Sequence, residues 1–480
     1  MAKLEMERAG GWFKYIRSAR YLPGRIIRVI VATTPPPHKS GPISVLPSEL
    51  LHAVFELLEF SDHNTLWNCM RVCRRWHHIA RPHFFAIVPV TYHHRKRFSK
   101  HFRAHPELGA HVKALRFVDN SWTNSDDLRH RRPGVRRGPF HIQLLASTLP
   151  LLPNLRDLSL VGYDNSSKFP LVQCQRTSVS LRRLSFHNCV GLPFILLEVL
   201  SLLSLDTLVV SVDLPDSSPH TDTPVPWSRC SFPRTELMQT SITIQNLVLR
   251  GCVNYPSTYY DTFELFSVPG SLRALDIAVY NQYLLRNIPT FLRSRAARDL
   301  LSLSVDLFCH EYGLWQIAVP PYLNLTGAPT VFHILGAAIT HCTRLQCVRI
   351  GFAYVGSPER DPVSQRDALL PMLESLPTTL RVFAIRIRLR PWRSWRQFCA
   401  DAAVGLDVVD RLLSPSGDGG GKFPNLRSVE LHIVEDPRRP GGTTANPLEE
   451  DDDLMLLPRL RAAGLLRFVH AIDRGQVQGK

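Results

Sequence analysis

The stretch "NLRDLSL" at residues 154–160 recurs along the chain and decides the fold that we expect. Its form is a leucine, an arginine, any residue, and then two apolar residues separated by one position. Composition alone predicts roughly one such match in a chain of this length. Further strict copies are "SLRRLSF" (180–186), "SLRALDI" (271–277), "TLRVFAI" (379–385) and "NLRSVEL" (425–431). We therefore interpret the phrase as a structural repeat.

The phrase predicts a short strand in each repeat, because its apolar residues alternate with other residues. Looser copies lie between the strict ones, and the leading apolar residues are 24 to 46 residues apart. Apolar segments at 138–152 and 330–342 predict helices between strands. One strand and one helix cannot bury their apolar faces alone, so the units must stack. The pattern predicts an α/β solenoid with a parallel sheet over residues 111–434. A mixed α/β domain without true repeats is the alternative.

A second dense apolar pattern is "LPSELLHAVFELLEFSDHNTLWNCMRVCRRWHHIA" at residues 46–80. Pro47 suits the first turn of a helix, and Ser61 or Asp62 suits the start of a second one. A third short helix would carry Trp76 and end at Pro82. Three helices in so few residues form a marginal core, so we expect this module to bind a partner or pack on the rest of the chain.

The order of residues in this stretch resembles the F-box family. The matching features are a Leu-Pro start, an apolar helix, a second apolar helix and the run "VCRRWHHIA" (72–80). The resemblance implies docking on a Skp-family adaptor, which links the chain to a cullin–RING ubiquitin ligase. It implies that the adaptor-facing residues are Leu46, Pro47, Leu50, Leu51, Val54, Phe55 and Trp76. An ordinary helical hairpin packed on its own chain is the alternative.

The repeat region resembles the irregular leucine-rich repeats of many F-box proteins. In such strands the residues between the inward apolar positions point to the opposite face. The resemblance implies that this face binds a protein target. The residues expected there are Asp157, Ser159, Arg183, Ser185, Asp276, Arg349 and Glu430. The whole chain would then be a substrate receptor, with ubiquitin transfer performed by other subunits and no catalytic residue here.

The expected organisation has five parts. They are a disordered basic arm (1–40), the F-box (41–90), a basic linker (91–110), the solenoid (111–434), and a loop with a C-terminal cap (435–480).

The net charge of +16 raises one rival function. A basic nucleic-acid-binding repeat protein could use residues 93–105 and 386–396. We do not expect nucleic acid as a partner, because no recognisable nucleic-acid fold surrounds these runs.

Other chemistry is not expected from the sequence. The chain has ten cysteines but no CxxC pair. Together with the expected lack of a secretory signal, this predicts a reduced setting, cytoplasmic or nuclear, with no membrane partner. Cys69, Cys73 and His77 share a helical spacing, but structural zinc sites draw ligands from separate elements, so no metal is expected. The run "SGDGGGKF" (416–423) departs from a phosphate loop, and no cofactor is expected.

Overall fold

The computed structural model describes the helices, the strands and the turns next to them. The described residues are 46–59, 62–91, 94–119, 142–163, 180–187, 189, 199, 204–211, 243–250, 268–279, 288–307, 331–354, 362–389, 406–415, 422–435 and 457–472. The expected arm at 1–40 lies outside them.

The chain forms two compact units that divide between Ser204 and Leu205. The first unit begins with three helices and continues with alternating strands and helices. Its elements are α2 (Ser48–Glu59), α3 (His63–Met70), α4 (Arg74–Ala86), β1 (Ile87–Thr91), α5 (Arg95–Ala104), α6 (Pro106–Gly109), β2 (Ala114–Val118), α8 (Ile142–Thr148), the 3-10 turn η6 (Leu149–Leu151), β3 (Asp157–Val161) and β4 (Ser180–His187).

The second unit consists of strands joined by long connections, some of them helical. Its elements are β5 (Ser204–Ser211), β6 (Asn246–Arg250), β7 (Ala274–Val279), β8 (Ser302–Leu307), α13 (Val331–Ile339), β9 (Cys347–Tyr354), α14 (Pro362–Ser375), β10 (Val382–Leu389), β11 (Ser428–Glu435), α16 (Pro458–Ala462) and β12 (Leu466–Ile472). Residues 406–413 are also helical.

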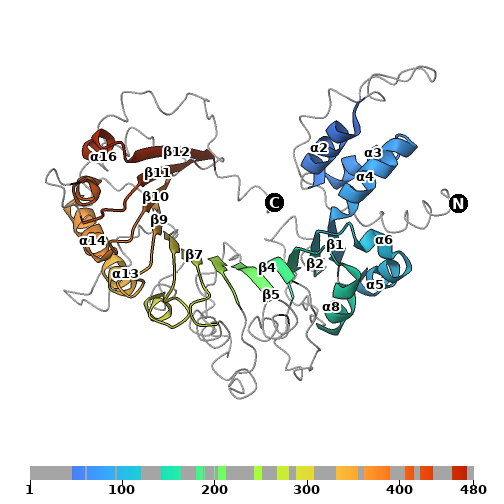
Figure 1. Ribbon diagram of the computed structural model, residues 1–480, viewed down its shortest axis with the longest axis horizontal. Helices are drawn as coiled ribbons and strands as arrows, with labels where there is room; N and C mark the ends of the chain where they lie inside the picture. Colours follow the sequence, from blue (N-terminus) through green and yellow to red (C-terminus); the bar gives the residue numbers. More distant parts are fainter. Residues whose placement is uncertain are drawn as a thin grey trace, which may run out of the picture. The chain divides into compact units, whose positions relative to one another are not determined.

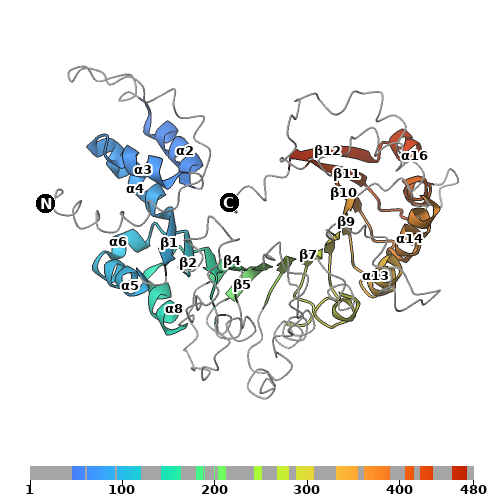
Figure 2. The same ribbon diagram turned by 180° about the vertical axis from the view of Figure 1, so that it is seen from behind.

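The twelve strands of the described residues form one sheet, in which their order is that of the sequence. Within each unit, neighbouring strands pair in parallel. In the second unit, α13, α14 and α16 lie on one side of the strands (Figures 1 and 2). The predicted α/β class, with three N-terminal helices followed by a parallel sheet, is confirmed. The arrangement is consistent with a solenoid-like fold.

One register row shows why the repeated phrase forms this sheet. The inward apolar residue of each strand in the second unit pairs with that of the next, from Leu208 in β5 to Val429 in β11. Every member is at most 2 % exposed. Complete burial of such a side chain contributes roughly 1.5–3 kcal/mol, so the row is a large part of the core. Its members are Leu208, Leu247, Leu275, Leu303, Val348, Phe383 and Val429.

Two segments contain regular structure that the expected organisation did not specify. Residues 91–110, expected as a basic linker, contain α5 and α6, and Phe98 and Phe102 of α5 are fully buried. Residues 435–480, expected as a loop and cap, contribute β12, which pairs with β11. In both segments a few apolar residues are buried against neighbouring elements. The charge content of the segment does not predict this burial.

Gly351 allows an ion pair to form across three strands. Asp306 of β8, Gly351 of β9 and Arg386 of β10 are consecutive partners in the register. The Arg386 guanidinium reaches over the glycine to Asp306, with Nη1 3.0 Å from Oδ2. A Cβ atom at position 351 would collide with Oδ1 of Asp306. The absence of a side chain at this position therefore makes room for the pair.

We expect Gly351→Ala to lower the free energy of unfolding by about 1–3 kcal/mol, because the added methyl group must displace the Asp306 carboxylate. Chemical denaturation of the full chain measures this loss. In the Asp306→Ala background the same substitution should cost far less. Equal losses in the two backgrounds would show that the glycine does not act through this carboxylate.

Candidate functional site

Helix α2 presents two apolar faces, and only one of them is covered. Leu51 and Phe55 are 2 % and 1 % exposed, whereas Leu50 and Val54 are 53 % and 49 % exposed. Neighbouring positions on a helix point about 100° apart, so a helix that is apolar on two sides can serve both a core and a surface.

The covered face forms a small core with the two following helices. Buried residues from all three helices pack together, and aromatic side chains border the cluster. Trp76 lies against Phe55 edge to face, with ring centroids 5.6 Å apart. The core residues are Leu51, Phe55, Leu66, Met70, Ala80 and Phe84.

Polar caps set where the helices of this core begin. The Asp62 carboxylate accepts hydrogen bonds from the backbone N–H groups of Asn64 and Thr65, both at 3.0 Å, and starts α3. The Cys73 sulfur accepts one from Trp76 N–H at 3.5 Å and starts α4. In addition, the Arg75 guanidinium donates to the Leu46 carbonyl oxygen at 2.6 Å, which ties α4 to the residue before α2.

The uncovered apolar residues gather in this short domain. Six large apolar side chains of the described residues are classed as exposed, and five of them lie between positions 46 and 72. Leu50, Val54 and Leu57 follow the i, i+4, i+7 spacing of one helix face. Leu46 precedes α2, and Val72 lies in the turn between α3 and α4. We call these residues the exposed apolar set: Leu46, Leu50, Val54, Leu57 and Val72.

The structure sorts the predicted adaptor-facing residues into two groups. Leu46, Pro47, Leu50 and Val54 are exposed. Leu51 and Phe55 belong to the core, and Trp76 is half-buried against it. These last three therefore hold the domain together rather than offer free surface. Leu57 and Val72 were not among the predicted contacts, although the helical spacing from Leu50 already pointed to Leu57.

Two local expectations in this region are wrong. Pro82 does not end the third helix, because α4 continues to Ala86. The buried residues His83, Phe84 and Ala86 follow the proline, and their packing outweighs the lost backbone hydrogen bond. Cys69, Cys73 and His77 do not share one helix, because α3 ends at Met70 and α4 begins at Arg74.

A buried carboxylate joins this domain to the strands that follow it. Glu59, at the end of α2, is 3 % exposed. Its Oε1 lies 2.6 Å from Nδ1 of His83 in α4 and 3.3 Å from Nζ of Lys113, the residue before β2. Helix α4 also continues into β1 without a loop. The three helices and the first strands are therefore held to each other by both charge and chain.

The predicted target-facing residues of the first unit lie on neighbouring strands. Asp157 pairs with Arg183 in the register, and Ser159 pairs with Ser185. Arg183 is exposed, and the Asp157 carboxylate lies 3.0 Å from the guanidinium of Arg182. Ser185 is only 5 % exposed, so a partner cannot reach it without a rearrangement.

The predicted residues of the second unit share one row of the sheet. The register runs from Asp276 through Ser304, Arg349 and Ala384 to Glu430. This row alternates with the buried apolar row, so it faces the other side of the strands. Asp276 contacts Arg250 at 3.5 Å, and Glu430 contacts His432 at 2.8 Å.

Two groups on this face keep an unused hydrogen-bonding atom. Nε of Arg349 and Oδ1 of Asp306 are buried without a hydrogen-bond partner. Burial raises the pKa of the Asp306 carboxyl, and the Arg386 charge opposes that shift. We name the residues of the second unit that line this side the open face: Arg250, Asp276, Asp306, Arg349, Arg386, Glu430 and His432.

The two basic runs considered for nucleic acid are described in part. In α5 the phenylalanines point inward, and Lys96, Arg97, Lys100 and Arg103 remain exposed. Of the run at 386–396, only residues 386–389 are described, and Arg386 is engaged by Asp306.

Comparison with known families identifies the N-terminal domain. The family model described as F-box-like matches residues 43–85. This range covers α2, α3 and nearly all of α4, and with them the core and the exposed apolar set. The chain therefore contains an F-box-like domain at its N-terminal end. A search of curated proteins returned no match.

The family match bears on function in general terms. An F-box domain points to adaptor binding within a Skp–cullin–F-box ubiquitin ligase, and F-box proteins are in general non-catalytic. None of the helices in the described residues is both long and apolar enough to cross a membrane.

His63 should make this domain less stable in mild acid. Burial lowers the pKa of its imidazole, a shift that the nearby Asp62 charge opposes. Its Nε2 is buried without a hydrogen-bond partner. A lowered folded pKa means that stability is lost as the pH falls through the unfolded pKa, which is 6.5.

We expect the wild-type chain to lose stability faster than His63→Gln between pH 7 and pH 5. The difference in slope for one proton is at most about 1.4 kcal/mol per pH unit. Urea denaturation, followed by tryptophan fluorescence at several pH values, measures it. Parallel pH profiles for the two proteins would contradict the role given to His63.

Proposed function

We propose that this chain is a substrate receptor of a Skp–cullin–F-box ubiquitin ligase. The F-box-like domain docks on a Skp-family adaptor, and the open face of the repeat strands holds a protein target. Ubiquitin transfer is performed by other subunits. The contribution of this chain is proximity, because a target held near charged ubiquitin experiences a high effective concentration.

The exposed apolar set is the observation that carries this proposal. Five exposed aliphatic side chains do not stabilise so small a domain by themselves. Exposed apolar patches of this kind mark protein interaction sites. The set lies inside the residues that match the F-box-like model. We therefore assign adaptor docking to Leu46, Leu50, Val54, Leu57 and Val72, with Pro47 fixing the start of α2. Leu51, Phe55 and Trp76 support this surface from below.

The attachment of the F-box-like domain supports a receptor role. The Glu59 contacts with His83 and Lys113, and the direct passage from α4 into β1, limit independent movement of the helices and the first strands. A receptor benefits from such a junction, because a fixed geometry keeps a bound target within reach of the transfer site.

The chemistry of the open face supports target binding there. Apart from the buried Asp306, its charged residues are at least partly exposed, and they include both signs, which suits binding to a protein surface of mixed charge. The buried and unpaired atoms of Arg349 and Asp306 would gain partners from a target backbone or side chain. We propose Asp276, Arg349 and Glu430 as target contacts, and in the first unit Asp157, Ser159 and Arg183.

The docking surface can be tested by placing a charge within it. We expect Leu50→Asp and Val54→Asp each to weaken binding of the full chain to a Skp-family adaptor of its host by about 2 kcal/mol or more, because each buries a carboxylate at the interface. Surface plasmon resonance with the purified adaptor measures the affinity.

The matched control is Glu56→Gln, which changes an exposed residue on another side of the same helix. It should leave the affinity within about twofold, because it lies off the apolar face. Failure of the wild-type chain to bind any host adaptor would rule out the proposed function.

The target surface can be tested by charge reversal. We expect Asp276→Lys and Arg349→Glu to change which proteins co-purify with the full chain, while adaptor binding and the free energy of unfolding stay within about 0.5 kcal/mol for Asp276. Quantitative mass spectrometry of purified complexes provides the measurement. Arg381→Gln, an exposed change just before β10, serves as control. An unchanged set of partners in both reversed variants would exclude this face.

A further inference from the structure

The outer edge of β12 is not used by the proposed function. Within the described part of the chain, β12 pairs with β11 on one side and ends the sheet (Figure 1). Its residue Val469 is 36 % exposed, and it is the sixth exposed large apolar side chain of the described residues, outside the exposed apolar set. An unpaired strand edge offers a row of N–H and C=O groups to another strand. The edge of β12 is therefore a candidate interaction surface.

The strand at the other end of the sheet is protected against such pairing. β1 has five residues, and Pro89 at its centre has no N–H group to donate. A short strand and a proline within it are two common ways in which proteins prevent further pairing at an edge. β12 has seven residues, contains no proline or lysine, and has Arg467 as its one permanently charged residue. The protection present at β1 is therefore missing at β12.

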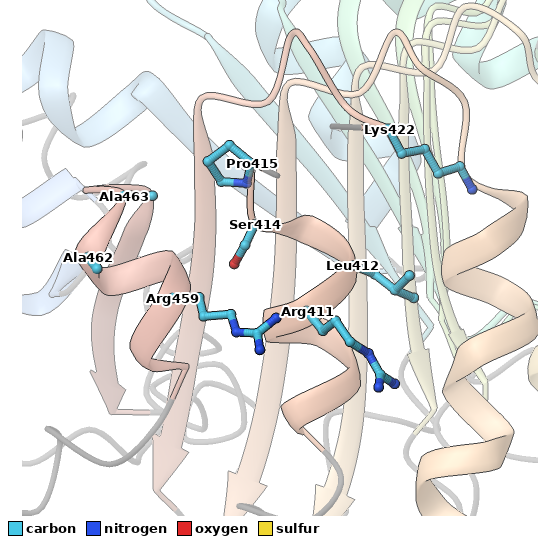
Figure 3. Close-up of a pocket in the computed structure, with 8 residues that line it drawn as sticks. All are labelled: Arg411, Leu412, Ser414, Pro415, Lys422, Arg459, Ala462 and Ala463. Atoms are coloured by element: carbon cyan, nitrogen blue, oxygen red, sulfur yellow. The ribbon is translucent and has the colours of Figure 1, made fainter. Parts of the chain in front are cut away.

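The contacts of α16 hold the start of β12 in place. Asp410 is 5 % exposed, and it accepts hydrogen bonds from the backbone N–H groups of Arg459 at 3.1 Å and Leu460 at 2.9 Å. The helix at 406–413 and α16 thus stand next to each other in front of the strands, and together they border a hollow of about 700 Å³ (Figure 3). The Leu460 carbonyl oxygen in turn accepts from the N–H of Leu465, directly before β12, at 2.9 Å. β12 is therefore an anchored strand.

The hydrogen bonds to β11 show which residues of β12 direct their backbone groups outward. The Val429 N–H of β11 donates to the carbonyl oxygen of Leu465 at 2.8 Å, and Val429 is the register partner of Leu466. In a parallel ladder this contact turns the backbone groups of Arg467 and Val469 toward β11. Because backbone groups alternate sides along a strand, those of residues 466, 468, 470 and 472 point to the outer edge. These are the groups that a further strand would bond.

Two copies of β12 match each other in the antiparallel direction. A two-fold axis at the middle residue, Val469, pairs all seven residues of one strand with those of the other. The outward groups then meet each other, Leu466 with residue 472 and Phe468 with residue 470, and each such pair exchanges two hydrogen bonds. The total of about eight hydrogen bonds is close to the roughly ten of a typical protein interface.

The residue types also fit this register. Val469 meets Val469 of the second copy in the close class of antiparallel pair, with Cα atoms about 4.5 Å apart, so the two exposed side chains cover each other. Arg467 is placed opposite Ala471, an uncharged residue, and about 13 Å along the strand from the second Arg467. A two-fold axis at Arg467 would instead oppose like charges directly, which is unfavourable.

We propose that the edge of β12 is a self-association surface, on which a second copy of this chain adds its own β12 in the antiparallel register centred on Val469. The occupant is a second copy, because the outward hydrogen-bonding groups, the exposed valine and the separated arginines complement themselves. The resulting dimer holds two F-box-like domains in one assembly, which raises the avidity for a partner that presents two sites.

Sedimentation velocity of the purified full chain tests the association. We expect a dimer at micromolar concentrations for the wild-type chain and also for Leu50→Asp, in which the exposed apolar set is disrupted. Val469→Lys should weaken dimerisation by at least about tenfold, because it removes the apolar contact and opposes two ammonium groups. The matched control is Val248→Lys, which changes a partly exposed valine on the same face of the inner strand β6. It should change the dissociation constant by less than about twofold.

Cysteine substitutions test the register. Val469→Cys should give a disulfide-linked dimer on mild oxidation, because the Cα atoms of the central pair lie within the range that a disulfide spans. Arg467→Cys is also at an exposed position, but about 13 Å separates it from its counterpart, so it should stay unlinked. Non-reducing gel electrophoresis, with the oxidised wild-type chain as background, measures the difference.

Several results would overturn the proposal. They are monomeric wild-type and Leu50→Asp chains, equal cross-linking of the two cysteine variants, and equal weakening by Val469→Lys and Val248→Lys. A monomer whose co-purifying proteins change in Val469→Lys would also overturn it, and would assign the edge to an extended segment of a target. Because adaptor docking involves other residues, the outcome is independent of the proposed function.

Discussion

The burial of one row of apolar side chains is the constraint on which the rest of this molecule depends. A single strand with Leu275 or Leu303 on one face would leave that face in water. Neighbouring strands and a covering layer of helices bury that face. The strands are parallel because each connection crosses back on the same side of the sheet. The regular register from Leu208 to Val429 is the result. Everything on the opposite face is placed by this row, because side chains alternate along each strand.

In the F-box-like domain, by contrast, burial of the apolar side chains is incomplete. Its three helices bury some of their apolar residues in one small core, and their other large apolar side chains stay exposed. Leu50 and Leu51 are neighbours in sequence, yet one is half exposed and the other is buried, because the helix turns between them. The uncovered face is the surface that we propose for adaptor docking. The Glu59 contacts with His83 and Lys113 satisfy a buried charge and at the same time fix this domain to the first strands.

Polar groups divide between the two sides of the second unit according to their neighbours. On the open face, Asp306 and Arg386 pair across Gly351, because a residue without a side chain separates them. On the helical side, the Asp410 carboxylate accepts hydrogen bonds from two backbone N–H groups of α16 and joins that helix to residues 406–413. In both places a buried carboxylate is satisfied by a partner from a neighbouring element, so it contributes to the fold.

The sequence by itself determined the order of strands, the three N-terminal helices and the F-box-like domain. These depend on local periodicity and on a compact ordered motif, which one chain displays without its fold. It also placed Asp276, Arg349 and Glu430 on one face, because alternation in a strand is a local property. Only the tertiary structure separated Leu50 and Val54 from Leu51 and Phe55, carried α4 through Pro82, and covered Ser185. It alone brought the Asp410 carboxylate to the backbone of α16. The reason is that the exposure and the contacts of a residue depend on which distant segments cover it. A local sequence pattern carries no information about those segments.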